Sequence, residues 1–435
     1  MLPILRRNIL QALFNILRIR LLISFKTYEN RFLLLLFVLG IILRCIYTYY
    51  VYNNVGTSNW ADDWEYLSMG KQIADGNWNP KKENAGFMVV GPVIPIVVAL
   101  FTLVFTEPVI PFFIYNVVVT SLLIFVLFFL GKEVFNKKIG TVLAIWGLFF
   151  IETYKYCPHI LKEPTLFLLV PLTIFFIIRT LNKEKHSILY VFLASLSFTI
   201  LIHTDERFFI YLPVFFLFFF LIKPPKLLRS LKMASLWSAF VLLLMVPWTI
   251  RNYIVFDQVV ILTPRTTAFT SKLFGDNISG IASHFNDKLA KQKIIDYRKE
   301  EAIKFGDQYN VFPREYGSKE ARCKAFINFW QPTYFKATFI QYGYRPQKWS
   351  LAHNISGLLF YGVYLPFYFL GFYLLIKKQN CIGLSVAFIP IIHSLMHAYM
   401  VWPLERYRSP ITFIVVMVGI WVLTEMGKQI KQKFS

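Results

Sequence analysis

Apolar residues form long blocks along this chain, and short polar stretches separate one block from the next. The first block, residues 32–52, reads FLLLLFVLGIILRCIYTYYVY, which as a helix is long enough to cross the roughly 30 Å apolar core of a bilayer. Nine further blocks of similar character follow it, at residues 109–131, 139–157, 164–181, 188–203, 208–222, 233–250, 352–376, 381–400 and 409–426. The pattern predicts an all-α polytopic membrane protein with about ten transmembrane helices.

One more apolar stretch, residues 89–105, decides which side of the membrane each later loop faces. It is short for a crossing and holds Gly91, Pro92 and Pro95 near its start. If it does not cross, the loops on the amino-terminal side carry most of the basic residues, namely Lys132, Lys137, Lys138, Arg179, Lys183, Lys185, Lys223, Lys226, Arg229, Lys232, Lys377, Lys378 and Lys428. The opposite short loops then carry only Lys155, Lys162, Arg207, Arg406 and Arg408. Because cytoplasmic loops collect lysine and arginine, we predict that this stretch dips into the outer leaflet and returns.

This topology places both chain ends in the cytoplasm and divides the chain into four parts. Residues 1–31 are basic, show no signal-peptide cleavage site, and lie along the inner membrane surface unless they are an ordinary cytosolic extension. We expect residues 32–250 to form a transmembrane module whose first outer loop, 53–108, contains juxtamembrane helices. Residues 251–350 should form a small extracytoplasmic subdomain, and residues 351–435 the carboxy-terminal transmembrane helices.

The composition excludes a soluble globular protein, because 56% of the residues are hydrophobic and only 16% are charged. The net charge of +22 could indicate a nucleic-acid partner, but the basic residues lie in loops between apolar blocks. We therefore predict membrane lipids, and no nucleic acid, as partners. The four cysteines, Cys45, Cys157, Cys323 and Cys381, have no paired or metal-ligand spacing, so neither a disulfide framework nor a zinc site is predicted.

Carboxylates are crowded where the chain leaves the first predicted span, in the sequence ADDWEYLSMG. Asp62 and Asp63 are adjacent, Glu65 follows, and Tyr66 begins a helical spacing of apolar residues. One interpretation is structural: Asp62 caps a surface helix and Glu65 completes a capping box. The other is catalytic, since repulsion between crowded carboxylates raises their basicity and suits one of them to act as a general base.

Two further polar clusters fall on the same predicted face. HILKEPTLF places Lys162 and Glu163 between two predicted spans, where they are either solvated charges or site residues. MVPWTIRNYIVFD places Arg251 and Asn252 directly after a span, at the height of the lipid phosphates. For these two residues, snorkelling to lipid is the structural alternative to substrate binding.

A third cluster, WPLERYRSP, lies before the last predicted span. Arg406 and Arg408 flank Tyr407 on a face where basic residues are scarce, so they call for a specific reason. Guanidinium groups bind phosphate oxygens in bidentate fashion. A substrate that carries phosphate is therefore the natural partner.

Two remaining polar groups favour structural roles. His393 and His397 stand four residues apart on one helix face, but no third metal ligand is apparent, so hydrogen bonding between helices is the favoured interpretation and no metal site is predicted. In HTDERF, the sequence places Asp205 and Glu206 next to Arg207. Such a group is more often a self-neutralised turn than a site.

Together, these stretches resemble the GT-C membrane glycosyltransferases, in particular the bacterial group similar to protein O-mannosyltransferases and aminoarabinose transferases. The resemblance rests on the order of the motifs and covers about nine tenths of the chain, beginning after the first 30 residues. The matching residues are Asp62, Asp63, Tyr66, Glu163, Pro247, Trp248, Arg251, Asn252, Phe274 to Asn277, Arg406, Tyr407, Arg408 and Pro410. The sequence departs from the family in having Asp63 where glutamate is commoner, and in showing no evident metal-binding histidine in the first outer loop.

The resemblance implies a polyprenyl-phosphate sugar as donor, a lipid, glycan or protein as acceptor, and no cofactor. Transfer to a hydroxyl group needs a base, for which we predict Asp62, with Asp63 or Glu163 orienting the acceptor or tuning the basicity of Asp62. Charge on the leaving phosphate can be held without a metal by the cations Lys162, Arg251, Arg406 and Arg408. The other predicted substrate-binding residues are Tyr66, Asn252 and Tyr407. A single displacement would invert the anomeric centre.

We expect the protein in the inner membrane of a bacterium, with its active site on the extracytoplasmic face. Two other functions remain open: a lipid or glycan transporter or flippase, and an oligosaccharide polymerase or ligase. Transporters usually show paired repeats and charges deep within spans, whereas only Arg44 lies well inside a predicted span. The glycosyltransferase hypothesis requires the acids near position 62 and the guanidinium groups near positions 251 and 406 to converge on one cavity.

Overall fold

The computed structural model describes residues 28–54, 61–78, 91–182, 187–222, 227–256, 259–263, 319–332, 355–400 and 405–434. Every regular element in these residues is an α-helix or a 3₁₀ helix, so the predicted all-α polytopic fold is confirmed. Among them, eight helical segments are long and apolar enough to cross a membrane. They are α2 (Tyr28–Asn54), α5 (Val109–Val134), α8 (Glu163–Asn182), α9 (Ser187–Thr204), α11 (Leu227–Phe256), the segment Ile355–Lys377 that ends in α17 (Leu365–Lys377), α18 (Cys381–Met400) and α20 (Thr412–Phe434).

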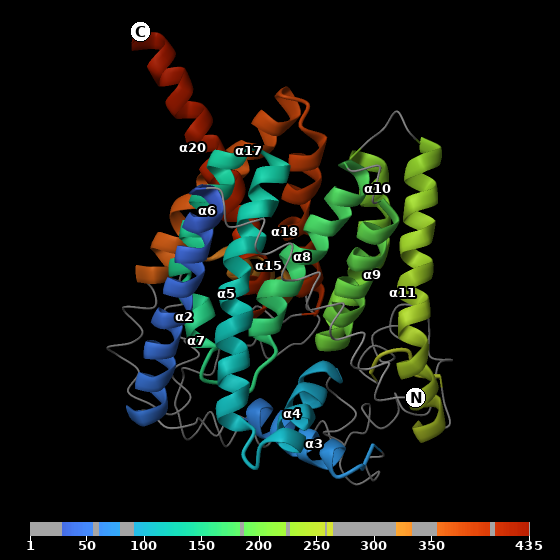
Figure 1. Ribbon diagram of the computed structural model, residues 1–435. Coiled ribbons are helices and arrows are strands. Elements are labelled where there is room, and N and C mark those ends of the chain that lie inside the picture. The colour runs from blue at the N-terminus through green and yellow to red at the C-terminus, as the bar shows by residue number, and fades with distance from the viewer. Residues whose placement is uncertain are drawn as a thin grey trace.

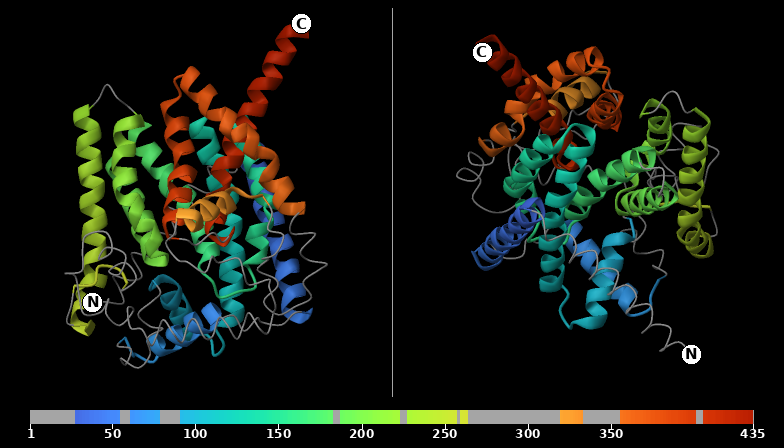
Figure 2. Two further views of the ribbon diagram at one scale, coloured as in Figure 1. Left: turned by 180° about the vertical axis from the view of Figure 1, so that it is seen from behind. Right: turned by 45° about the horizontal axis from the view of Figure 1, so that its top comes forward.

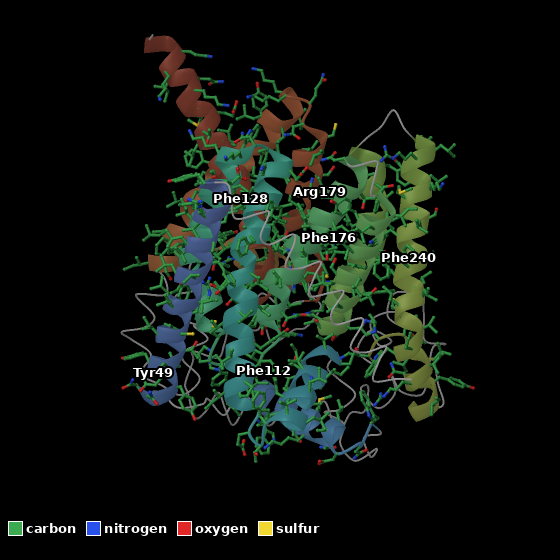
Figure 3. The ribbon with its side chains drawn as sticks, viewed as in Figure 1. Tyr49, Phe112, Phe128, Phe176, Arg179 and Phe240 are labelled. Carbon is green, nitrogen blue, oxygen red and sulfur yellow. The ribbon has the colours of Figure 1, made fainter. Side chains whose placement is uncertain are left out.

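With the shorter helices α6 (Lys137–Phe149) and α10 (Tyr211–Ile222) counted among them, the long helices alternate in direction along the chain, and the bundle has two ends (Figure 1, Figure 2). Glu29 at the start of α2 pairs with Lys132 at the end of α5, at 3.0 Å, and with Lys137, at 2.6 Å. Arg179 lies at the same end of the bundle (Figure 3). We call this end, which carries Glu29, Lys132, Lys137 and Arg179, the basic end. The opposite one, which carries α3 (Ala61–Ala74), is called the site end.

The predicted span 139–157 is broken into two helices. They are α6 (Lys137–Phe149) and α7 (Ile151–Lys155). Phe150 between them has an extended backbone, with ψ of 103°, and such a break leaves carbonyl groups at the end of α6 without helical partners. Arg44, fully buried in α2, donates to one of them, the carbonyl of Gly147, at 3.1 Å. The same guanidinium donates to Thr153 Oγ1 in α7 at 2.8 Å, so a charge inside a span stabilises the break.

The predicted span 208–222 is also shorter as an α-helix. A 3₁₀ turn comes first and the α-helix follows: they are η2 (Glu206–Ile210) and α10 (Tyr211–Ile222). Pro213 explains this start, because in a continuous α-helix its ring would clash with the carbonyl of Phe209. The Asp205 side chain caps the 3₁₀ turn by accepting from the backbone N–H of Arg207 at 3.2 Å.

Two short helices, α3 and α4 (Val93–Val104), lie across the site end of the bundle (Figure 1). α4 has 12 residues, or about 18 Å at 1.5 Å per residue, which is too short for a crossing. Its length agrees with the prediction that residues 89–105 do not span the membrane. Gly91, just before α4, packs against the end of α9 so closely that a Cβ atom would lie 2.0 Å from the carbonyl oxygen of His203.

Aromatic side chains fill much of the core between α9, α10 and α11. Trp237 is fully buried, and the ring of Phe198 lies 5.2 Å from it between centroids. Phe215 and Phe219 of α10 pack on the same indole. The remaining described elements are α15 (Lys319–Trp330), η6 (Gly362–Tyr364), α19 (Glu405–Arg408) and η7 (Ser409–Ile411). Most of the predicted segments 1–31 and 251–350 lies outside the described residues, so the domain boundaries stay predictions.

Candidate active site

The polar loop between α7 and α8 is held by a buried side chain from α5. Asn116 is fully buried, and its Nδ2 donates to the carbonyl oxygens of Cys157 at 3.2 Å and His159 at 2.7 Å. α8 begins directly after this loop, at Glu163, whose side chain is buried. These bonds fix Lys162 and Glu163, two of the predicted site residues, at the site end.

Asp205, between α9 and η2, is the centre of a buried ionic cluster. One of its carboxylate oxygens lies 3.1 Å from Lys162 Nζ, and the other accepts from Arg207 Nε at 2.8 Å. Burial alone would raise the pKa of Asp205, but the charges of Arg207 and Lys162 outweigh it and hold that pKa well below its ordinary value. Asp205 is therefore ionised at physiological pH and keeps two cations in place inside the protein.

Arg207 joins this cluster to the motif RYRSP. Its guanidinium carbon lies 3.8 Å from the centroid of the Tyr407 ring. The carbonyl of Tyr407 accepts a hydrogen bond from His393 Nε2 at 2.8 Å, and its ring stacks on His397 with centroids 5.2 Å apart. His393 Nδ1 pairs with the hydroxyl of Tyr211 in α10. His393 thus bonds to neighbouring elements, while His397 bonds to His393 and stacks on Tyr407. No group of three or more His, Cys, Asp or Glu side chains in the described part of the chain could hold a metal ion.

Asp63, in the first turns of α3, faces the loop that carries Lys162. Its Oδ2 lies 3.4 Å from Nδ1 of His159, which precedes Lys162 in that loop. Tyr66, one turn further along α3, is buried in the hydrophobic core. Asp62 belongs to the first turn of α3, but its side chain lies outside the described residues.

Arg251 and Asn252 lie inside α11, which continues past residue 250. Asn252 Nδ2 donates to two carbonyl groups of residues 259–263, at 2.9 and 3.1 Å, and so holds the chain that follows α11. The Arg251 guanidinium donates to the carbonyl of Trp78, beyond the far end of α3 from Asp63. At 1.5 Å per residue, the helical part of α3 that separates them is about 17 Å long.

Arg408 is buried and bonded to a different element. Its Nη1 donates to the carbonyl oxygens of Phe329, at 2.9 Å, and Gln331, at the end of α15. Its guanidinium carbon lies 4.1 Å from the centroid of the Tyr361 ring. Because the last carbonyl groups of a helix attract cations, Arg408 docks α15 onto the RYRSP motif. The side chain of Arg406 lies outside the described residues.

The predicted site residues therefore fall into two groups. Direct contacts connect Asp63 with the loop of Lys162, and connect Lys162 with Tyr407 through the ionic cluster. Arg251 lies at the other end of α3, and Arg408 faces α15. The contacts bring acids and cations together at the site end. Among the predicted phosphate-binding cations, Lys162 is the one whose loop contacts Asp63.

Asp205 and Arg207 share a buried cluster with the candidate residue Lys162, whereas the sequence HTDERF predicts a self-neutralised turn. The ion pair inside this turn exists, but it is buried and shared with Lys162. A signal was present in the sequence. Lys162 and Arg207 are both basic residues on a face where few occur, and a cation that becomes buried needs an anionic partner.

Part of the chain matches a known family in sequence. Residues 89–250 match the model of the family described as dolichyl-phosphate-mannose-protein mannosyltransferase. The matched segment begins just before α4 and ends within α11, so it contains Lys162 and the cluster around Asp205. No curated protein matches the chain.

Solved structures of the oligosaccharyltransferase from Archaeoglobus fulgidus share the fold. The apo form matches with a TM-score of 0.51 and 12% identity, over 94% of this chain and 52% of that one. A complex with an inhibitory peptide and a dolichol-phosphate matches with a TM-score of 0.54 and 11% identity, over 92% of this chain and 51% of that one. This chain therefore spans about half the length of the solved proteins that it matches.

The sequence match and the structural match point to one superfamily. The mannosyltransferase family model and the archaeal oligosaccharyltransferase both represent GT-C enzymes. At identities near 12%, the structural likeness concerns the fold, and the family model carries the sequence relationship over its own segment. The resemblance of this chain to the GT-C membrane glycosyltransferases is thus confirmed, in sequence over residues 89–250 and in fold over most of the chain.

Proposed function

We propose that this chain transfers a sugar from a polyprenyl-phosphate donor to an acceptor hydroxyl group. The observation that carries the proposal is the buried cluster of Lys162, Asp205 and Arg207, which lies beside the loop contacted by Asp63. Such a transfer needs a base for the acceptor and fixed cations for the phosphate. The structurally similar oligosaccharyltransferase from Archaeoglobus fulgidus was solved in complex with a dolichol-phosphate, which supports a lipid carrier of this class.

The acceptor loses its proton as its oxygen attacks the anomeric carbon. We assign Asp62 as the base that takes this proton, with Asp63 or Glu163 orienting the acceptor. The new bond forms between the acceptor oxygen and the anomeric carbon, while the bond from that carbon to the phosphate oxygen breaks. The bonding electrons leave with the phosphate, and the anomeric configuration is inverted because one displacement occurs.

The leaving group is a polyprenyl phosphate, whose charge increases as its bond to the sugar breaks. Lys162 is the best-placed cation, since its loop also contacts Asp63 and since Asp205 fixes its ammonium group. Arg406 and Arg408 are further phosphate ligands, whereas Arg251, at the other end of α3 from Asp63, binds the substrate away from the phosphate. Tyr66, Asn252 and Tyr407 shape the substrate site. These cations supply the positive charge that a divalent metal would otherwise provide.

The distribution of charge supports a site on the extracytoplasmic face. The basic end carries Glu29 among several cations, Lys132, Lys137 and Arg179 included, and cytoplasmic segments collect lysine and arginine. With the basic end in the cytoplasm, the site end faces the outside of a bacterial inner membrane. The acceptor there is an exported lipid, glycan or protein.

The test begins with the donor. In a strain lacking this gene, mass spectrometry of polyprenyl-linked sugars should show one species accumulating, because its consumption has stopped. That species is then supplied to the purified protein in lipid nanodiscs. Asp62→Asn should lower the transfer rate by at least about 100-fold, the low end of what a general base contributes. Asp75→Asn, an exposed carboxylate beyond the other end of α3, is the control and should match the wild type.

Three results would contradict parts of the proposal. Full transfer by correctly inserted Asp62→Asn would exclude this residue as the base. Movement of the lipid-linked sugar across a vesicle membrane without transfer would favour a flippase. Use of a diphosphate-linked glycan in place of a phosphate-linked sugar would favour a polymerase or ligase.

A further inference from the structure

Four planar side chains form a continuous stack between the ionic cluster and α15. The guanidinium of Arg207 lies 3.8 Å above the centroid of the Tyr407 ring. Tyr407 stacks on His397 with centroids 5.2 Å apart and planes 6° apart, and His397 stacks on Phe329 with centroids 5.8 Å and planes 18° apart. The stack therefore begins at the α9–α10 connection, passes through α19 and α18, and ends on α15.

The stack is packed inside the protein. His397 and Phe329 are each 1% exposed, so neither ring has room to turn away from its neighbour. At the other end, Arg207 is bonded to Asp205, and Asp205 is bonded to Lys162. The stack therefore adds a second contact to the guanidinium that Asp205 holds, and Asp205 connects this guanidinium with Lys162.

α15 is also attached through its backbone. Arg408 donates to the carbonyl of Phe329, and the adjacent residue Tyr407 reaches the ring of Phe329 through His397. Phe329 is thus held by Arg408 directly and by Tyr407 through His397. This double attachment fixes both the height and the orientation of the ring.

We infer that Phe329 is a positioning residue for the cations that receive the donor phosphate. The inference rests on the proposed function and deepens it, because it gives α15 a part in binding a polyprenyl phosphate. Phe329 itself touches no donor in this account. It holds His397 and Tyr407, and these hold Arg207 and, through Asp205, Lys162.

The experiment measures binding of undecaprenyl phosphate and the kinetics of transfer with purified full-length protein. Phe329→Leu removes the ring and should weaken binding about 5- to 10-fold, with the same increase in KM for the donor and little change in kcat. Phe329→Tyr keeps the aromatic plane, so its binding should stay closer to the wild type than that of Phe329→Leu. Phe326→Leu changes a ring on the same helix that packs on Trp330 outside the stack, so it should bind as the wild type does.

A second variant tests whether the effect passes through the stack. Tyr407→Leu interrupts it, so adding Phe329→Leu to Tyr407→Leu should weaken binding no further. Equal losses in both backgrounds, or a Phe329→Leu protein that binds like Phe326→Leu, would overturn the inference and leave the proposed function standing. A wild-type protein that neither binds undecaprenyl phosphate nor transfers sugar would overturn both. Phe329→Met replaces Phe329→Leu if the latter does not fold.

Discussion

At the scale of single residues, the candidate site depends on charges held away from water. Asp205 is fully buried, and Lys162 and Arg207 neutralise it from two sides. Arg44 is a second buried charge, and its guanidinium bonds a carbonyl group and a hydroxyl group at the break between α6 and α7. Removing one member of such a set costs more than the set contributes, because its partners remain buried without compensation.

The first prediction concerns Asp205→Asn. The amide can still accept a hydrogen bond, but it leaves the charges of Lys162 and Arg207 without their anion, so the free energy of unfolding should fall by about 3–5 kcal/mol. Thermal and chemical unfolding in detergent measures the change. Glu107→Gln removes an exposed carboxylate near the same end and should stay within about 0.5 kcal/mol of the wild type. Similar losses for both variants would show that the buried cluster contributes nothing specific.

The difference in unfolding free energy between the wild type and Asp205→Asn should depend on pH. Burial raises the pKa of Asp205, but Arg207 and Lys162 outweigh that effect and depress it. A carboxyl group with a depressed pKa stabilises the fold above its unfolded pKa of about 3.9, and this stabilisation is lost as the pH falls through the folded pKa. The gap in unfolding free energy between wild type and Asp205→Asn should therefore be constant from about pH 5 to 8 and shrink below about pH 4. A gap that widens on acidification would contradict the assignment.

At the scale of elements, the sequence predicts where helices lie better than where they stop. Hydropathy averages over a block of residues, so it does not register one extended residue at Phe150 or the geometry that Pro213 imposes. Both predicted spans 139–157 and 208–222 therefore begin or end differently in the structure. Residues 89–105 were predictable as a short helix because glycine and proline interrupt the block visibly.

The candidate site follows the same rule. That Asp63, Lys162 and Tyr407 lie on a common face was predictable, because charge bias assigns each loop to a side of the membrane. The partner of Lys162 was not, because Asp205 comes from a different loop and no spacing in the sequence determines which loops meet. Long-range contacts of this kind depend on how helices pack, which sequence periodicity alone leaves open.

A prediction at this scale concerns the contact between α4 and α9. In Gly91→Ala, the new Cβ would meet the backbone carbonyl of His203 at 2.0 Å, so α4 must move away from the residues that precede Asp205. The free energy of unfolding should fall by about 1–3 kcal/mol, as measured by thermal unfolding in detergent. Gly427→Ala is the matched control, because a Cβ at Gly427 in α20 meets nothing within 4 Å. Equal melting temperatures for the two variants would show that Gly91 does not pack against the carbonyl of His203 as closely as the structure indicates.

At the scale of the whole molecule, the difference in charge between the two ends predicts the orientation of the protein in the membrane. The eight long segments, together with the shorter α6 and α10, carry the described chain from the basic end at Tyr28 back to the basic end after Thr412. This property was accessible to sequence analysis, because charge bias is a sum over many loops and tolerates an error in any single helix boundary. The proposed extracytoplasmic site depends on it directly.

The natural cysteines of the chain can test this orientation. Cys323 is exposed on α15, which Arg408 holds against the RYRSP motif, and Cys381 is exposed where α18 begins at the basic end. A membrane-impermeant maleimide added to intact spheroplasts should label Cys323 and leave Cys381 unreacted, whereas permeabilised membranes should show both labelled. Cys157 is buried, and Cys45 lies within the span of α2 against lipid, so neither should interfere.

The variants Cys323→Ser and Cys381→Ser assign each label to its residue, and neither side chain has a place in the proposed chemistry. Loss of the spheroplast label in Cys323→Ser, with retention in Cys381→Ser, is the expected pattern. The reverse pattern would place the basic end outside the cell, against the usual distribution of lysine and arginine. The cluster around Asp205 would then face the cytoplasm, and transfer to an exported acceptor could not take place there.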